Sequence, residues 1–377
     1  MISGLRTPDF EIAQATSHDR SLEHELADWF RVHTSVLIGF SGGVDSAYLA
    51  CVAVDALGAE RVLAVIGRSA SYPAEQWARA RAVADRFRVP VLEVSTDELN
   101  DPRYAANPSN RCYFCKTELW DVLVPIARER GLGVVVDGTN ADDLTDHRPG
   151  ARAAHEHNVR SPLAELGFTK DTIRRLSKAR GIETWSQPSS PCLSSRIPYG
   201  TQVTPDRLRQ VERAESELRA IGVDGDLRVR YHGDLARVEL NAEALGAWLA
   251  PSARTSLAEA VRAGGFDVVA VDLRGFRSGS LNVLGGVVAE PLVRARASSG
   301  SGDATGLADA LRRIDLNCEV LARARLGVLR CVEQRDTDRL IDGERRREVV
   351  ETARRFGFTH VAVEIEPAAR DATIRRD

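Results

Sequence analysis

A glycine-rich turn between an apolar run and a helical stretch constrains this chain more than any other feature. The turn is SGGVDS at residues 41–46, and the apolar run before it, 35–40, is typical of a buried parallel strand. Residues 47–53 after it are apolar and form helices well. Two glycines let backbone N–H groups approach an anion, which the positive end of the helix also attracts. Ser41 and Ser46 add hydroxyl donors, whereas Asp45 indicates contact with a cation or a role in orienting the loop.

The turn lacks the Gly-Lys-Ser/Thr ending of a Walker A loop. It resembles instead the SGGxDS pyrophosphate loop of the ATP pyrophosphatases. That resemblance implies an enzyme that splits ATP into AMP and pyrophosphate while it adenylates a substrate oxygen. The ATP-binding residues that it implies in the loop are Ser41, Gly42, Gly43, Asp45 and Ser46.

Strands and helices alternate from residue 35 to about 190. Short apolar runs predict strands at 62–66, 91–94 and 134–136. Helical patterns run over 73–87, 116–130 and 169–180. This alternation predicts an α/β fold with a doubly wound parallel sheet, whose ligands bind at the carboxyl ends of the strands.

The sequence predicts five segments in 377 residues. They are a helical lead-in (1–34), the ATP pyrophosphatase domain (35–198), a smaller α+β domain for substrate or oligomerisation (199–283), a flexible linker (284–310) and an appended helix–strand segment (311–377). The prediction of a linker rests on the Ser- and Gly-rich composition around 298–306. The string GFTHVAVEI at 357–365 resembles GFDVVAVDL at 265–273, so we interpret the last segment as a partial repeat of 253–274, although helix–Gly-Phe–strand sequences are common.

Composition excludes several classes of protein. The net charge of −3 gives no general attraction to nucleic acid, and no apolar run reaches membrane-spanning length. The N-terminus lacks a signal-peptide pattern, and six cysteines in so long a chain do not suggest a disulfide scaffold. These features indicate a cytoplasmic protein, in which grouped cysteines point to metal binding or catalysis.

Three of the six cysteines are candidates for metal binding or catalysis. Cys112 and Cys115 form a CxxC pair in a loop that leads into a helix, a spacing found in zinc sites, iron–sulfur sites and redox pairs. Cys192 lies in a stretch full of turn residues, which predicts an exposed loop. A structural zinc site is an alternative interpretation of the CxxC pair, but a fourth ligand is not obvious. Cys51, Cys318 and Cys331 are interpreted as structural.

Carboxylates follow the strand at 134–136, at the sheet edge where the first loop also lies. Cleavage of ATP requires Mg²⁺ on its phosphates, and Asp142 or Asp143 could supply ligands. Gly138 and Thr139 precede them, and we expect both to contact phosphate. By itself this segment would be an ordinary solvated turn, and its pairing with the first loop favours the functional interpretation.

Several blocks occur together in an order that resembles the LarE family, ATP-dependent sulfur transferases of nickel-pincer nucleotide biosynthesis. The blocks are SGGVDS (41–46), NRCYFCK (110–116), DGTNADD (137–143), RPG (148–150), VRSPL (159–163), PCLSSRIPYG (191–200) and RGFRSGSLN (274–282). The resemblance covers about 20–283 and leaves the tail after about 284 unassigned.

The resemblance implies a two-stage reaction. ATP adenylates a carboxylate of pyridinium-3,5-biscarboxylic acid mononucleotide, and sulfur then displaces AMP to give a thiocarboxylate. In family members with a single cysteine, the residue at the position of Cys192 gives up its own sulfur and becomes dehydroalanine. Members with cysteines at the positions of Cys112, Cys115 and Cys192 resemble enzymes whose 4Fe–4S cluster carries an extra sulfide. Because this chain has all three, we expect the cluster version, with the sacrificial version as its alternative.

The substrate of this reaction carries a phosphate, which requires cationic side chains. We expect Arg196 and Arg230 to bind it, with Ser194 and Ser195 as hydroxyl donors. Arg228 is a substitute for Arg230 because alternation places both on one strand face. The resemblance also implies a homo-oligomer, and the sulfur donor stays open.

Three other functions are compatible with parts of the sequence. A tRNA thiolase also pairs a pyrophosphate loop with cysteines, but it needs a basic RNA-binding surface. A glutamine-dependent amidotransferase needs an ammonia source, and no cysteine follows Met1. A module that only senses AMP or ATP would not need the cysteine trio.

Overall fold

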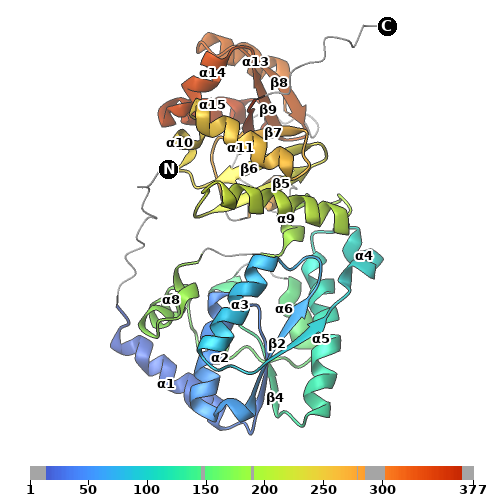
Figure 1. The fold of residues 1–377 in the computed structure, drawn as a ribbon, viewed down its shortest axis with the longest axis vertical. Coiled ribbons are helices and arrows are strands. Elements are labelled where there is room, and N and C mark those ends of the chain that lie inside the picture. Colours follow the sequence, from blue (N-terminus) through green and yellow to red (C-terminus); the bar gives the residue numbers. More distant parts are fainter. Residues whose placement is uncertain (1–13, 146–148, 188–190, 278, 285–301, 367–377) are drawn as a thin grey trace. The chain divides into compact units, whose positions relative to one another are not determined.

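The computed structural model describes residues 14–145, 149–187, 191–277, 279–284 and 302–366 (Figure 1). Residues 1–13 of the predicted lead-in, Arg148 of the RPG block and residues 285–301 of the predicted linker lie outside the described residues. By its contacts the chain divides into two compact units, the first formed by 1–192 with 202–205 and the second by 193–201 with 206–377. Among the described helices, none combines the length and the apolarity needed to cross a membrane.

The first unit is built on a parallel sheet of four strands in the order β3-β2-β1-β4. Its strands are β1 (Val36–Gly39), β2 (Val62–Arg68), β3 (Val91–Ser95) and β4 (Val134–Val136). Strand β1 lies in the middle, and its Val36 is in register with Val62 on one side and Val134 on the other. Burial on both faces explains why β1 is apolar at each position rather than alternating.

Helices cover both faces of this sheet. They are α1 (Ser17–Arg31), α2 (Val44–Leu57), α3 (Ala74–Arg86), α4 (Pro102–Ala105), α5 (Arg111–Glu129), α6 (Pro149–Glu156), α7 (Pro162–Glu165) and α8 (Lys170–Ala179). Val36 and Ile38 share a core with α1, α2, α3 and α8, whereas Leu37 packs with α5 and α6. The predicted α/β fold with a doubly wound parallel sheet is confirmed.

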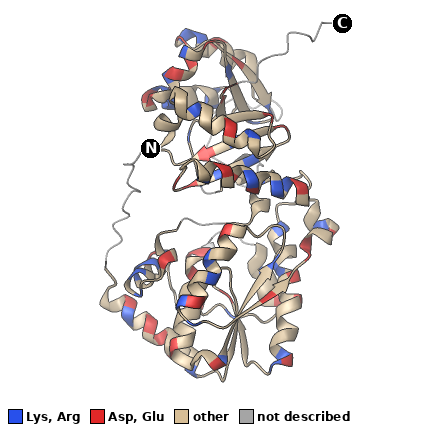
Figure 2. Cartoon of the chain, in the orientation of Figure 1, with Lys and Arg blue, Asp and Glu red and all other residues tan. Residues whose placement is uncertain are grey.

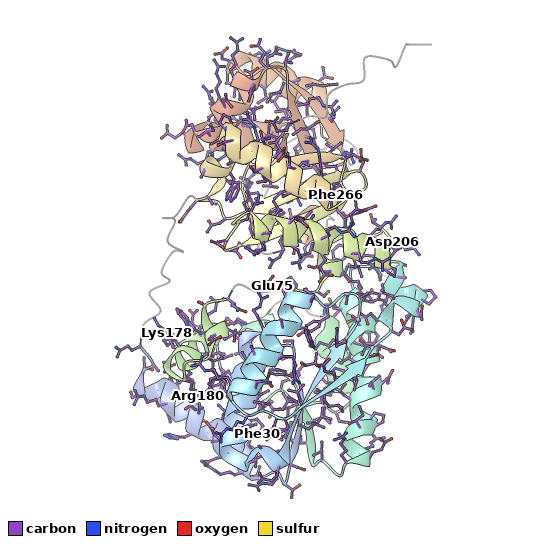
Figure 3. The ribbon with its side chains drawn as sticks, in the orientation of Figure 1. Phe30, Glu75, Lys178, Arg180, Asp206 and Phe266 are labelled. Atoms are coloured by element: carbon purple, nitrogen blue, oxygen red, sulfur yellow. The ribbon has the colours of Figure 1, made fainter. Side chains whose placement is uncertain are left out.

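Helices α1, α2 and α8 are joined by both apolar and charged contacts. Phe30 of α1 is fully buried in their shared core, and Arg180 follows the last residue of α8 (Figure 3). The Nε and Nη2 atoms of Arg180 donate to Glu23 at 3.0 Å, and Nη1 donates to Asp55 at 2.5 Å. The guanidinium therefore links the C-terminal end of α8 to α1 and α2.

The second unit contains a six-stranded mixed sheet in the order β5-β6-β7-β10-β9-β8. Its strands are β5 (Leu227–His232), β6 (Leu235–Leu240), β7 (Val268–Asp272), β8 (Cys318–Arg323), β9 (Leu326–Cys331) and β10 (His360–Glu364). Its helices are α9 (Pro205–Ala220), α10 (Leu245–Leu249), α11 (Pro251–Ala263), α12 (Ser280–Leu284), α13 (Ala304–Arg313), α14 (Gln334–Asp338) and α15 (Gly343–Arg355). The predicted α+β domain and the appended segment thus contribute strands to one sheet.

The order helix, hairpin, helix, strand occurs twice in this unit, first in 205–273 and again in 304–365. In the first half the N–H groups of Asp267 and Val268 donate to the carbonyl of Asp234. In the second half Thr359 and His360 donate in the same way to Arg325. Whether the tail arose by duplication stays a prediction, but the similarity extends from the predicted 253–274 to the whole module.

The two halves meet at the centre of the sheet, where β7 and β10 pair antiparallel with Val271 opposite Val363. Leu273 donates to the carbonyl of Val361 at 3.0 Å, and Ile365 donates to that of Val269 at 2.9 Å. A local two-fold axis between β7 and β10 would interchange these two bonds, as in the symmetric interface of a dimer. The second half thereby covers the edge of β7, which would otherwise expose unpaired backbone groups.

Residues 304–310, which the sequence analysis assigned to the linker, belong to helix α13. Asp303 caps this helix by accepting a hydrogen bond from the N–H of Gly306, and Leu307 and Leu311 are buried at helical spacing. The sequence does not reveal where α13 begins, because residues such as Ser and Asp, which precede the helix, favour helix caps as well as loops.

Candidate active site

The glycine-rich turn joins the end of β1 to the start of α2, with Gly43 as the N-cap. Gly42 has a φ of +69°, a left-handed conformation that glycine adopts without strain. The hydroxyl of Ser46 accepts the N–H of Ser41 at 3.2 Å and donates to the carbonyl of Gly43 at 3.2 Å. The Ser41 hydroxyl lies 3.1 Å from that of Ser46. The two predicted hydroxyl donors therefore lie together at the positive end of α2.

Helix α3 and the residue before its N-cap hold the turn from outside. The Tyr72 hydroxyl and the Gln76 side-chain amide each donate to the carbonyl of Ser41 at 2.9 Å. A Cβ atom on Gly42 would lie 2.3 Å from the Cβ of Ala80, so the turn and the helix are in direct contact. The sequence analysis did not predict these contacts, because no motif links the turn to residues that follow it by 26 to 38 positions.

Asp45 meets a cation, one of the two roles that the sequence left open for it. Its carboxylate pairs with the Nζ of Lys170 at 2.5 Å and lies 3.5 Å from the side-chain amide of Asn140. Lys170 is the first residue of α8, and its backbone N–H also donates to Asp142 at 2.7 Å. Lys170 was missed by sequence reasoning because a lysine at the start of an amphipathic helix carries no signal of its own.

The segment after β4 lies directly against the glycine-rich turn. A Cβ atom on Gly138 would lie 3.0 Å from the backbone N of Ser46, closer than most real Cβ contacts, so glycine suits this approach. Asp137 accepts hydrogen bonds from the hydroxyls of Ser161 at 2.7 Å and Thr139 at 2.9 Å. The carboxyl ends of β1 and β4 therefore meet at one edge of the sheet, as parallel topology requires.

The predicted magnesium ligands lie on the same segment. Asp142 is exposed and accepts from the backbone of Lys170, whereas Asp143 is partly exposed and accepts from the backbone N–H of Asn140 at 3.2 Å. Asn140 in turn accepts the N–H groups of both aspartates through its side-chain oxygen. This network fixes the loop while both carboxylates stay accessible to a cation.

We expect Lys170→Gln to lower kcat/KM for ATP by at least about tenfold, the effect of losing one charged contact to phosphate. The Asp45 carboxylate would then repel the incoming polyphosphate without compensation. Pyrophosphate release measured against ATP concentration tests this expectation. Lys178→Gln is the matched control, because Lys178 is exposed on the same helix (Figure 3). Equal losses in both variants would contradict a specific role for Lys170.

The three predicted sulfur-site cysteines belong to the first unit. Cys112 and Cys115 lie in the first turns of α5, and Cys192 precedes a short 3₁₀ turn. Burial raises the pKa of the Cys115 thiol well above its usual range, and the charges of Glu98, Cys192 and Cys112 raise it further. Cys115 therefore lies within electrostatic range of both other thiols. Within the ranges that the structure describes, no three cysteine, histidine or acidic side chains are grouped closely enough to hold a metal.

The other cysteines differ in setting. Cys51 is buried within α2, and this burial raises the pKa of its thiol to about 12. This burial disfavours the thiolate of Cys51 and suits the structural role that the sequence analysis expected for it. Cys318 and Cys331 lie opposite each other in the second unit.

The predicted phosphate-binding arginines lie in a buried charged cluster of the second unit. Nε and Nη2 of Arg196 each donate to a different oxygen of Glu215 at 2.9 Å. Arg230 binds Glu239 through the same two nitrogens, and its Nη1 donates to the carbonyl of Ser195 at 2.9 Å. The Ser195 hydroxyl accepts from Arg196 at 3.2 Å. The structure therefore brings Ser195, Arg196 and Arg230 together and adds two carboxylates that sequence reasoning missed.

Further arginines extend this cluster. Arg237 is fully buried between Glu239 at 2.8 Å and Asp272 at 2.5 Å. Arg277 also pairs with Asp272 at 3.3 Å. Burial, followed by the like charge of Arg196, lowers the pKa of Arg228 to about 10. Burial and the neighbouring arginines thus disfavour the charged form of Arg228, whereas Glu215 and Asp226 favour it.

On α9 and α11, basic side chains alternate with acidic ones rather than forming a basic stripe (Figure 2). A tRNA thiolase would need a continuous positive surface for the phosphate backbone.

Comparison with known proteins defines the class of enzyme. A family model described as NAD synthase matches residues 20–106, which include the strand, glycine-rich turn and helix of the site. The glutamine-dependent NAD(+) synthetase of Aquifex aeolicus is 34% identical over 88 residues, 22% of this chain and 16% of that protein. With the parallel sheet and the SGGVDS turn, this match defines an enzyme of the pyrophosphate-loop ATP pyrophosphatase type.

Two relatives match over most of their length. An uncharacterized protein of Synechocystis sp. is 43% identical over 257 residues, 68% of this chain and 95% of that protein. The pyridinium-3,5-bisthiocarboxylic acid mononucleotide synthase of Lactiplantibacillus plantarum is 36% identical over 247 residues, 66% of this chain and 88% of that protein. The chain therefore belongs to the LarE family, as the sequence blocks predicted.

Proposed function

We propose that this protein is an ATP-dependent sulfur transferase acting on pyridinium-3,5-biscarboxylic acid mononucleotide. It adenylates a carboxylate of that substrate, releases pyrophosphate and converts the acyl adenylate to a thiocarboxylate. The observation that carries the proposal is a pyrophosphate loop and three cysteines within one unit of a chain that is 36% identical to a synthase of the bisthiocarboxylate.

Activation must come first because a carboxylate is a poor acyl donor. The N–H groups around Gly42 and Gly43 receive the phosphates, and the exposed Asp142 and partly exposed Asp143 would bind Mg²⁺. The hydroxyls of Ser41, Ser46 and Thr139 would donate to phosphate as well, once ATP replaces the Gly43 carbonyl and the Asp137 carboxylate as the partners of Ser46 and Thr139. Asp45 holds the Lys170 ammonium group, which would contribute a positive charge beside them. Together these groups compensate the charge that develops on the leaving pyrophosphate.

The donor chemistry of the cysteine trio suits an iron–sulfur group, although the described structure does not bring the three side chains together as a metal site. Three thiolates are soft ligands, and the partly exposed Cys115, whose thiol is hard to ionise alone, would be stabilised as a thiolate by a metal cation. Cys112, Cys115 and Cys192 would hold a 4Fe–4S cluster, which supplies one iron free to carry an exchangeable sulfide. In the sacrificial alternative, Cys192 itself attacks the acyl adenylate.

The product identifies the reaction. We expect incubation with ATP, Mg²⁺ and the biscarboxylate mononucleotide to give AMP, pyrophosphate and a nucleotide in which sulfur replaces oxygen, as resolved by mass spectrometry. Iron and acid-labile sulfide after anaerobic purification decide between the two sulfur sources. Absence of iron, together with dehydroalanine at position 192 after turnover, would establish the sacrificial route. ATP cleavage without any sulfur-containing product would contradict the proposed function.

The arginine cluster is proposed as the binding site for the phosphate of the substrate. Within the described residues, the Nη2 atoms of Arg237 and Arg277 are buried without a hydrogen-bond partner. Buried donors that lack partners are costly, and an anion between them would satisfy both. A phosphate would also balance the charge that lowers the pKa of Arg228.

We expect Arg228→Gln to raise KM for the nucleotide substrate about 10- to 100-fold, the effect of one charged hydrogen bond. KM for ATP should not change. Arg228 donates to the Leu227 carbonyl and stacks on Phe276, so its replacement leaves both arginine–carboxylate pairs intact. Removing one of several buried like charges should keep or raise the melting temperature, because Arg196 and Arg230 both disfavour the charge on Arg228. Arg209→Gln on the exposed side of α9 is the control, and an unchanged KM in Arg228→Gln would exclude this arginine from the site.

A further inference from the structure

Cys318 and Cys331 face each other across the β8–β9 hairpin, outside the site described above. They are direct register partners, and their Sγ atoms are 2.7 Å apart. The adjacent pair is hydrogen-bonded, since Val332 donates to the carbonyl of Asn317 at 2.9 Å. Cys318 and Cys331 therefore form a non-hydrogen-bonded pair, in which opposite side chains are closest and Cα atoms are about 4.5 Å apart. Such spacing allows a disulfide without movement of the backbone.

The first half of the unit shows that this hairpin does not need cysteines in order to pack. In its β5–β6 hairpin the corresponding cross-strand pair is Leu227 with Leu240, and both are buried. Two-residue turns close both hairpins, so the positions correspond one to one. The thiol pair is therefore a chemical difference between two similar hairpins.

The two thiols differ in accessibility and in ionisation. Cys318 is buried, whereas Cys331 is partly exposed. The contact with Cys318 lowers the pKa of Cys331, while the same contact and burial raise that of Cys318. Cys331 is thus the thiol that ionises first and meets reagents from solution, and Cys318 is placed to attack its sulfur afterwards.

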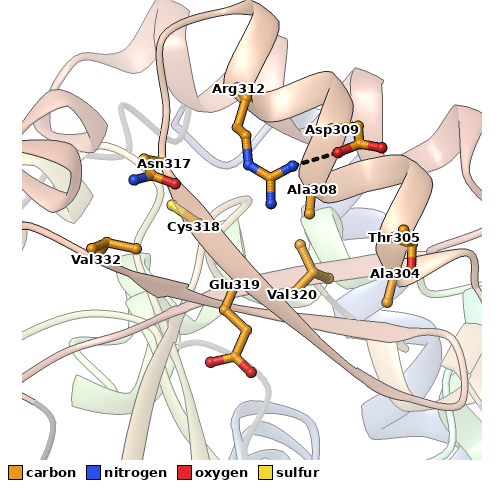
Figure 4. Close-up of a pocket in the computed structure, with 10 residues that line it drawn as sticks. All are labelled: Ala304, Thr305, Ala308, Asp309, Arg312, Asn317, Cys318, Glu319, Val320 and Val332. Carbon is orange, nitrogen blue, oxygen red and sulfur yellow. Dashed lines mark hydrogen bonds and ion pairs between the residues drawn. The ribbon is translucent and has the colours of Figure 1, made fainter.

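A hollow of about 380 Å³ adjoins the pair between α13 and β8 (Figure 4). Cys318 and Asn317 lie in its wall, together with Arg312 and Thr305. Arg312 is ion-paired with Asp309, as Figure 4 shows. Cys318 therefore borders a hollow of mixed polar and apolar lining, of a size suited to a small molecule, rather than closely packed core.

We propose that Cys331 and Cys318 form a reactive dithiol whose substrate is a small molecule with a sulfur–sulfur bond. The Cys331 thiolate attacks that bond and a small thiolate leaves, so Cys331 carries the captured sulfur fragment. The Cys318 thiolate then attacks the Cys331 sulfur and expels the fragment, which closes a Cys318–Cys331 disulfide. The two cysteines lose two electrons and two protons, and the substrate gains them.

The identity of the substrate sets the product. A disulfide RSSR gives two molecules of RSH. A persulfide RSSH gives RSH and hydrogen sulfide, because Cys331 carries an –SH sulfur that Cys318 releases. The second case would supply sulfide for the proposed sulfur transfer and in that respect rests on the proposed function. The dithiol reaction itself requires neither ATP nor the nucleotide, so the two proposals can fail separately.

The test uses the full-length protein, reduced and freed of reductant without oxygen, then treated with glutathione disulfide or with glutathione persulfide. In both arms we expect peptide mass spectrometry to find Cys318 joined to Cys331. In the persulfide arm we also expect one sulfide per chain above the amount released by the double variant Cys318→Leu/Cys331→Leu. That variant copies the Leu227–Leu240 pair, so it should fold and keep pyrophosphate release, and it corrects for reactions at Cys112, Cys115 and Cys192.

The single variants test the order of the two steps. Cys318→Ser should stop with the fragment attached to Cys331, whereas Cys331→Ser should gain no fragment in the hairpin. Disulfide closure in both arms without extra sulfide would assign disulfides, not persulfides, as the substrate. No Cys318–Cys331 bond in either arm, or equal sulfide release from Cys318→Ser and the unchanged protein, would overturn the proposal.

Discussion

Cys192→Ala is expected to lower thiocarboxylate formation by at least about a thousandfold, the scale seen when an essential nucleophile is removed. Pyrophosphate release should persist, because adenylation depends on residues 41–46 and their neighbours and involves no thiol. Cys192 takes part in both proposed sulfur routes, so the result does not depend on which is used. Separate measurement of pyrophosphate and of the sulfur-containing nucleotide checks the prediction.

The variant Cys112→Ala separates the two routes. A cluster held by three thiolates would lose its iron and its sulfur transfer, whereas a sacrificial Cys192 would still deliver one sulfur per chain. Cys51→Ala is the control, because that buried thiol has a raised pKa and should affect neither product. Normal thiocarboxylate formation by Cys192→Ala would remove this residue from the path of sulfur.

Sequence predicted that the glycine-rich turn and the segment after β4 lie at one sheet edge, because the determinants of that edge are local. The strand, turn and helix around residues 41–46 are contiguous, and β4 with Gly138 follows the alternation that defines a parallel sheet. Sequence did not predict Lys170, Tyr72 or Gln76, which reach the turn only after the chain has folded. Their contacts depend on how α3 and α8 pack, and no residue spacing encodes that packing.

The arginine cluster shows a different limit. Strand alternation correctly placed Arg228 and Arg230 on one face, since the pairing of β5 with β6 sets them opposite Glu239 and Arg237. Yet the pattern described a solvated or ligand-binding strand face, and the structure buries these side chains with Glu215 and Glu239. Burial of charge depends on partners from other elements, and a single sequence does not reveal which carboxylates provide them.

The paired hairpins of the second unit illustrate what a short repeat can conceal. Only the strings at 265–273 and 357–365 are visibly similar, because β7 and β10 form the centre of the sheet and stay apolar. The outer hairpins have diverged, with Cys318 and Cys331 where the first half has leucines. Backbone hydrogen bonds preserve the common architecture where side chains no longer do.

The second large effect is expected from Gly42→Ala, which should reduce pyrophosphate release at least about a hundredfold, the scale of misplacing a reacting group by about 1 Å. Alanine at a φ of +69° costs about 1–2 kcal/mol. Its Cβ atom would also lie 2.3 Å from the Cβ of Ala80, so the turn must move away from α3. The N–H groups that receive the phosphates move with it. Titration of ATP against pyrophosphate release, with the melting temperature measured alongside, checks this result.

Gly43→Ala is the matched control because it adds the same methyl group one residue away. Gly43 has a φ of −71°, and a Cβ atom there would meet only the Ser41 hydroxyl, at 3.5 Å. We therefore expect a small change in activity and stability from this variant. Adding Ala80→Gly to Gly42→Ala removes the shortest contact, but the Cα atom of residue 80 would still lie 2.7 Å from the new methyl group and the backbone strain would stay. The double variant should therefore restore activity only in part. Full activity in Gly42→Ala alone would mean that the turn receives ATP in another conformation, and the cradle at the start of α2 would then not be the phosphate site.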